Sequence, residues 1–228
     1  MDWPALVLSL QLAAATVAVL LPLGIALGRI LAWRRFAGRR VLEAALALPL
    51  VLPPTVLGFY LLVAFGAGST LGSAFAALTG HPLAFSFAGL LLASLIVNLP
   101  FAIQPMQRAF EAIPDDVRAA AACCGMAPWR IFLRIELPLA WSGVLSAMVL
   151  TFAHTLGEFG VVLMVGGNIP GVTRTVSVSI YDSVQSLDYA SAAKTSLFLL
   201  IASFAILSLT YALQGSFRLA WPQRAEKR

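Results

Sequence analysis

Four long stretches of this 228-residue chain contain no Asp, Glu, Lys or Arg: residues 3–28, 44–107, 137–157 and 195–217. A helix needs about 20 consecutive apolar residues to cross a bilayer. The second stretch fits two crossings, because glycines and Pro82 interrupt its middle. The pattern predicts an all-α polytopic membrane protein, a single transmembrane domain over residues 1–228. Its five expected transmembrane helices lie near residues 6–28, 44–65, 84–107, 139–165 and 195–217.

Composition supports this class and excludes others. The chain is 60% hydrophobic and 11% charged, whereas soluble domains are about 45–50% apolar and about 25% charged. This excludes an ordinary cytosolic enzyme and a disordered binder. The first uncharged stretch has no preceding Lys or Arg and exceeds a usual signal-peptide core of about 7–15 residues. We therefore expect it to be a membrane span and not a cleaved signal.

The positions of Lys and Arg predict the orientation. Of 15 cations, 13 fall in the connections 29–43 and 108–136 or in the C-terminal tail, which contains Arg218, Arg224, Lys227 and Arg228. The alternate connections contain only Arg174 and Lys194. Cytoplasmic segments carry the excess of Lys and Arg, so we expect the N-terminus outside and the C-terminus inside. The positive charge is then a topology signal, and no nucleic-acid partner is implied.

The connections differ in how much structure they predict. Residues 66–83 are rich in small residues and indicate a passive connector. In the inner loop 108–138, Pro114 favours a helix start, Gly125 favours a left-handed helix end, and a second helix is expected from Pro128 to Ile135, stopping before Pro138. This hairpin could lie at the lipid headgroups or enter a groove on a soluble partner. We expect its adjacent Cys123 and Cys124 to be small, semi-buried side chains.

The outer segment 166–194 is too long for a simple loop. It begins with the turn-forming run Gly166–Gly171 and continues with alternating hydroxyl residues. Irregular backbone at membrane depth requires protein or water beside it, so a short helix or a re-entrant piece is expected. The sequence leaves open whether this segment contains an extra short span.

The inner hairpin resembles the conserved cytoplasmic loop of ABC importer permeases, which reads Glu-Ala-Ala, three residues, Gly, nine residues, Ile-x-Leu-Pro. The spacing matches throughout, although alanine replaces the glutamate of the pattern. The matching residues are Ala119, Ala120, Ala121, Gly125, Ile135, Leu137 and Pro138. The resemblance implies that this hairpin is a coupling helix docked on an ATPase, with the missing carboxylate affecting one polar contact.

Two further segments narrow the resemblance to molybdate permeases. Residues 48–58, Leu-Pro-Leu-Val-Leu-Pro-Pro-Thr-Val-Leu-Gly, are similar to their second span, and residues 155–160 are followed by Gly167-Asn168-Ile169-Pro170-Gly171. Sulfate permeases share the Gly-Glu-Phe/Tyr-Gly element, so that element alone does not decide the substrate. The resemblance implies a homodimer in the inner membrane, with ATPase subunits inside and a periplasmic oxyanion-binding protein outside.

The chain is not expected to be an enzyme. A phosphate-binding loop requires Gly-x4-Gly-Lys-Ser/Thr, and only Lys194-Thr195 offers its last pair, with Asp188 and Ala193 at the glycine positions. No catalytic set and no metal-ligand cluster is expected either. ATP and Mg²⁺ would be bound by the partner ATPase, and this chain would carry no cofactor of its own.

Glu158 is the only acidic residue inside a predicted span. Intramembrane ionisable residues are functional candidates, so Glu158 is either a gate residue or a carboxylate that pins helices together. Because molybdate is a dianion, substrate contact is disfavoured. His154 lies at i−4, within reach of a hydrogen bond.

The remaining candidates have competing explanations. Arg174 could bind an oxyanion by a charge-assisted hydrogen bond, pair with Asp182, or dock the binding protein. Prolines in the second span suit a pathway-lining kink, but are also common in membrane helices for packing reasons. The pathway or gate candidates are Pro53, Pro54, Thr55, His154, Glu158, Asn168 and Arg174.

These observations predict the membrane subunit of an ABC importer that moves an oxyanion, most simply molybdate, by ATP-driven alternating access. Within the class, the alternatives are sulfate and tungstate. Outside it, the alternative is a stand-alone anion channel or an ion-driven carrier. The hairpin argues against an autonomous pore, which needs no docking element.

Overall fold

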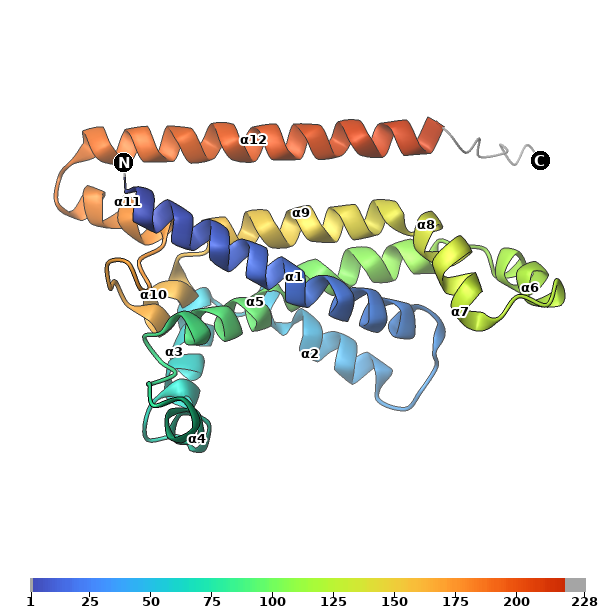
Figure 1. Ribbon diagram of the computed structural model, residues 1–228, viewed down its shortest axis with the longest axis horizontal. Helices are drawn as coiled ribbons and strands as arrows, with labels where there is room; N and C mark the ends of the chain where they lie inside the picture. Colours follow the sequence, from blue (N-terminus) through green and yellow to red (C-terminus); the bar gives the residue numbers. More distant parts are fainter. Residues whose placement is uncertain (1, 220–228) are drawn as a thin grey trace.

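The computed structural model describes residues 2–219 as helices and their connections, with no β-strand in that range (Figure 1). The all-α prediction is confirmed. The elements are α1 (Trp3–Trp33), α2 (Arg39–Val51), α3 (Pro54–Phe65), α4 (Thr70–Thr79), α5 (Phe87–Glu111), α6 (Asp115–Cys123), α7 (Pro128–Ile131), the π-helical turn η1 (Phe132–Glu136), α8 (Leu137–Leu139), α9 (Trp141–Gly157), α10 (Gly160–Gly166), α11 (Val176–Gln185) and α12 (Tyr189–Leu219).

The described residues contain three to five candidate membrane spans. α1, α5 and the Tyr189–Ser208 part of α12 are each long and apolar enough to cross a bilayer. Two further candidates are bent pairs: α2 and α3 meet at 109°, and the run Pro128–Leu139 meets α9 at 67°. The expected spans over 44–65 and 139–165 thus correspond to broken helices, and a kink at the prolines of the first was expected. The first breaks before Pro54 and the second ends at Gly157, where the backbone becomes extended.

α1, α5 and α9 form the central layer of the molecule and lie side by side in Figure 1. Small residues allow α1 and α5 to approach closely. A Cβ at Gly24 would lie 3.0 Å from the carbonyl oxygen of Ala102, and one at Gly28 would lie 3.0 Å from the amide nitrogen of Gln107. The Gly24/Gly28 face is thus a helix-packing surface.

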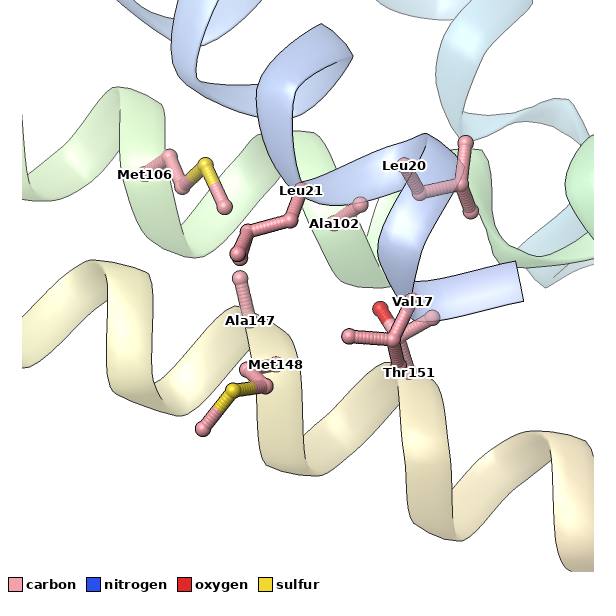
Figure 2. Close-up of a pocket in the computed structure, with 8 residues that line it drawn as sticks. All are labelled: Val17, Leu20, Leu21, Ala102, Met106, Ala147, Met148 and Thr151. Carbon is pink, nitrogen blue, oxygen red and sulfur yellow. The ribbon is translucent and has the colours of Figure 1, made fainter. Parts of the chain in front are cut away.

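The junction of these three helices is filled by side chains. Eight residues, drawn in Figure 2, line a gap that is too small to admit a water molecule: Val17, Leu20, Leu21, Ala102, Met106, Ala147, Met148 and Thr151. The hydroxyl of Thr151 is the only fully buried side-chain polar atom of the described residues without a hydrogen-bond partner. This junction is therefore a packed core in the single chain.

Two connections differ from simple loops. The expected passive connector 66–83 contains helix α4, so that interpretation is wrong. The Ser69 hydroxyl accepts a hydrogen bond from the Gly72 amide (2.8 Å), and Gly80 ends the helix with φ +77°. The segment 166–194 contains α11, a short helix as expected. Its ten residues are fewer than the about 20 that a span requires.

The connections gather at two ends of the molecule (Figure 1). The α1–α2 connection and helices α6 to α8 lie at one end, while α4, α10 and α11 lie at the other. The arginines of the connections 29–43 and 108–136 thus belong to one end. The tail cations Arg224, Lys227 and Arg228 lie outside the described residues.

Candidate translocation and coupling sites

Glu158 occupies the break between α9 and α10. Its side chain is 10% exposed, and its Oε1 atom accepts a hydrogen bond from the Val161 amide (2.9 Å). The Ser177 hydroxyl donates to the backbone carbonyl of Glu158 (2.7 Å). The carboxylate thus caps the first turn of α10, where a negative charge is favoured. This bond of the carboxylate is local to α10, and Ser177 bonds the backbone and not the carboxylate, so the pinning role and the gating role both stay predictions.

His154 does not form the expected hydrogen bond with Glu158. Their nearest side-chain atoms, Nε2 and Oε2, are 3.8 Å apart, which is too long for a hydrogen bond. The reason is that α9 ends at Gly157, so Glu158 leaves the helical register that brings i and i+4 together. Instead, Nδ1 of His154 lies 3.2 Å from Oδ1 of Asn98, and its ring stacks on Phe101 with centroids 4.2 Å apart.

A series of buried, hydrogen-bonded polar side chains connects His154 to α1 and α5. Asn98 donates to the Ser94 carbonyl (2.8 Å), and the Thr16 hydroxyl donates to that of Ser94 (2.9 Å). The hydroxyls of Ser94 and Thr155 are 3.5 Å apart. Hydrogen bonds of this kind hold membrane helices together. Sequence reasoning missed the hydroxyl residues, which are unremarkable in an apolar helix until their neighbours are known.

The structure brings the proline candidates to the same place as Glu158. Pro53 precedes α3 with an extended backbone, and Pro54 begins the helix. A Cβ at Gly160 would lie 2.7 Å from Cβ of Pro54 and 3.8 Å from Oε1 of Glu158. The bends of two predicted spans therefore meet here. Pro53, Pro54 and Thr55 are exposed in the single chain, and their role in a pathway stays a prediction.

Arg174 is held in a polar cluster at the α11 end. Its Nε donates to Oδ1 of Asn168 (2.6 Å), and its guanidinium lies 3.1 Å from Asp182 and 3.8 Å from Asp2. Asn168 also donates to Asp182 (2.6 Å). The pairing of Arg174 with Asp182 was one of the three expected alternatives. Arg174 thus has two carboxylate neighbours, and its side chain is 28% exposed.

The inner loop forms the expected helix–Gly–helix hairpin. α6 ends before Gly125, which has φ +76° and whose amide donates to Ala122 (2.9 Å). Pro114 directly precedes the first residue of α6, as expected for a helix start. One detail of the expectation is wrong, because the second helix does not stop before Pro138. The chain continues through the π-helical turn η1 into α8, and Pro138 lies in the first turn of α8, where a proline is tolerated.

One face of the hairpin is anchored and another is free. Among the motif residues, Ala121 is buried, Ile135 and Leu137 are half-buried, and Ala119, Ala120 and Pro138 are exposed. Large apolar side chains are exposed at Val117, Trp129 (61%) and Leu133.

Cys123 and Cys124 are also exposed, so the expected semi-buried position is wrong. Within residues 2–219, no group of three His, Cys, Asp or Glu side chains could hold a metal ion.

Sequence reasoning missed Glu136, the variable position of the Ile-x-Leu-Pro element. Its side chain is 1% exposed and accepts hydrogen bonds from Arg29 and Arg118. The available signal was a carboxylate directly after apolar Ile135 and before an uncharged stretch. Its two arginine partners lie 107 and 18 residues away in sequence and had been considered only as orientation signals.

A family model described as "Binding-protein-dependent transport system inner membrane component" matches residues 21–219. The molybdenum transport system permease protein ModB of Azotobacter vinelandii is 45% identical over 211 residues, covering 92% of this chain and 93% of that protein. The protein of the same name from Escherichia coli K12 is 37% identical over 185 residues, covering 81% of each chain.

The fold also resembles a solved transporter. A structure of the MetNI methionine ABC transporter in inward-facing conformations aligns with a TM-score of 0.67 at 16% identity. The alignment covers 95% of this chain and 94% of that chain. At this identity the similarity concerns the fold alone.

Proposed function

Because the chain belongs to the family of binding-protein-dependent transport system inner membrane components, we propose that it is the permease of an ABC importer for molybdate. It is a multi-pass inner-membrane protein and has no ATPase activity of its own. The observation that carries the substrate assignment is the near full-length similarity to molybdenum permeases. Sulfate and tungstate remain the competing substrates, because they are tetrahedral oxyanions of the same charge.

The proposed orientation places α6 to α8 in the cytoplasm. The arginines of the α1–α2 connection and of the hairpin lie at this end (Figure 1), and positive charge is retained on the cytoplasmic side. The end with α4, α10 and α11 then faces the periplasmic binding protein. Release of substrate from that protein would occur beside the Arg174 cluster.

Two copies of this chain would enclose the pathway. α2 has no buried residue, and only 11% of the span window in α12 is buried. These surfaces, together with Pro53, Pro54 and Thr55, are available to lipid and to a second copy. A path between two copies also agrees with the filled junction of α1, α5 and α9.

The hairpin is proposed to dock on the ATPase, which binds ATP and Mg²⁺. Its exposed Val117, Trp129 and Leu133 are large apolar side chains, which suits docking in a groove. Nucleotide-driven closure of two ATPase subunits would move the two hairpins and tilt the permease halves. The chemistry of ATP remains on the partner, and this chain supplies the moving path.

Replacing Trp129 with alanine should weaken binding of the ATPase by about tenfold or more, as expected for a buried aromatic anchor. The matched control is Trp3→Ala, because Trp3 is also 61% exposed. It is the first residue of α1 and lies far from the hairpin. Titration of the purified ATPase onto permease in detergent measures both affinities. Equal affinities for the two variants would contradict docking through this face, and no ATPase binding by the unmodified chain would favour a stand-alone carrier.

A further inference from the structure

Glu136 is a buried carboxylate shared by two arginines. Its Oε2 lies 2.7 Å from Nε of Arg29, and its Oε1 accepts hydrogen bonds from Nη2 of Arg29 (3.3 Å) and Nε of Arg118 (3.0 Å). The carboxylate is 1% exposed, whereas the arginine side chains are 36% and 28% exposed. A carboxylate buried in this way requires compensation by cations.

Aromatic rings support both arginines. The Arg118 guanidinium carbon lies 3.6 Å from the centroid of the Trp33 ring, and that of Arg29 lies 5.3 Å from the same ring. Arg29 is also 5.3 Å from the Phe132 ring. Such cation–π contacts fix the planes of the guanidinium groups. Trp33 itself packs edge-on against Phe110 of α5, with centroids 5.4 Å apart.

The three charged residues come from three separate elements. Arg29 lies in the last turns of α1, Arg118 in the middle of α6, and Glu136 at the end of η1. Only Ala121 of α6 is fully buried, so α6 has little apolar anchorage of its own. The other charge near Arg118 is Asp115, at 3.8 Å, and that carboxylate is 95% exposed. The Glu136 cluster is thus the main polar attachment of the hairpin to α1.

We propose that Glu136 is a positioning residue that makes the hairpin and the cytoplasmic end of α1 move as one body, so that ATPase motion reaches the membrane helices. This inference rests on the proposed function of the hairpin. Without the carboxylate, the two guanidinium groups would repel each other around Trp33. The hairpin could then still bind the ATPase through Trp129, but its movement would no longer displace α1.

The test uses the full transporter in proteoliposomes, with molybdate uptake and ATP hydrolysis measured together. In Glu136→Gln, ATP hydrolysis should stay within about twofold of the unmodified complex, while molybdate moved per ATP falls by at least about fivefold, within the range of coupling effects. The control is Arg108→Gln, because Arg108 lies at the same end of the molecule, is 84% exposed and forms an ion pair with Glu111 outside the Glu136 cluster. Its ratio of uptake to hydrolysis should be unchanged.

A second variant is needed in case the Glu136→Gln protein does not assemble. Arg118→Gln removes the ion pair between α6 and Glu136 but leaves the Arg29–Glu136 pair, so the buried carboxylate keeps one cation. It should lower uptake per ATP in the same way. A spin label on Cys123, in a Cys124→Ser background, should become more mobile in both variants, because the label sits at the end of α6.

The outcomes separate the two proposals. An unchanged ratio in Arg118→Gln, or a proportional loss of uptake and hydrolysis, would overturn the positioning role of Glu136. Absence of ATP-dependent uptake in the unmodified complex would instead contradict the proposed function itself.

Discussion

Replacing Gly125 with valine is expected to abolish the stimulation of ATP hydrolysis by the permease. Gly125 has φ +76° at the turn of the hairpin, and a Cβ there would meet no atom within 4 Å. The cost is therefore conformational and not steric crowding. A left-handed conformation costs an L-residue about 1–2 kcal/mol, and a β-branched side chain tolerates it least. Relief of that strain would reorient α6 relative to α7 and displace the surface proposed to dock on the ATPase.

The matched control for this change is Gly125→Asn, because asparagine adopts the left-handed conformation far more readily than valine. It should retain most of the stimulation, whereas both variants should keep the membrane helices intact. ATPase rates of the reconstituted complexes, with and without substrate, provide the measurement. Normal stimulation in the valine variant would show that the hairpin turn does not transmit the signal.

Glu158→Gln is expected to lower molybdate uptake by about tenfold, equivalent to about 1.4 kcal/mol in a barrier, while the complex still assembles. The amide oxygen of glutamine can accept the hydrogen bond from Val161, so the cap on α10 is retained. The negative charge at the break between α9 and α10 is lost, and with it the charge that faces His154. The change thus separates the charge of Glu158 from its structural hydrogen bond.

Two comparisons interpret that result. Glu158→Ala also removes the cap, so it should lower the thermal stability of the permease as well as uptake. Glu111→Gln neutralises a carboxylate at the last residue of α5, where the side chain is 28% exposed, and should transport normally. Uptake by Glu158→Gln equal to that of the unmodified protein would discard the gating hypothesis and leave Glu158 with its capping role.

The membrane class was predictable because charged residues are excluded from long stretches, a constraint that each stretch satisfies independently of its neighbours. The hairpin was predictable for a similar reason, since Gly125 and Pro128 determine local backbone geometry. Helix α4 was predictable from Ser69 and Gly80, a helix-capping pair, but the small-residue composition of 66–83 obscured this signal.

The breaks in the spans were harder to predict from the sequence. Pro53 and Pro54 predicted a kink, but the 109° bend depends on the packing of α3 against α10. The uncharged run through Gly157 gave no reason to end α9 there. His154 illustrates the consequence, because its expected partner Glu158 lies beyond the helix end and Asn98 replaces it.

The Glu136 cluster could not be predicted from one sequence. Its members are distant in the chain, and each had a sufficient local explanation: the arginines as orientation signals and the glutamate as the variable position of a motif. Only the packing of α1, α6 and η1 shows that the three charges share one buried site.

The central claim is that this chain moves molybdate only when a partner hydrolyses ATP. The most direct measurement is uptake of labelled molybdate into proteoliposomes that contain this chain, its ATPase and its binding protein, with excess sulfate as competitor and an ATPase-inactive complex in parallel. We predict uptake that survives sulfate and disappears with the inactive ATPase. Uptake abolished by sulfate would assign sulfate as the substrate, and uptake independent of ATP hydrolysis would contradict the account.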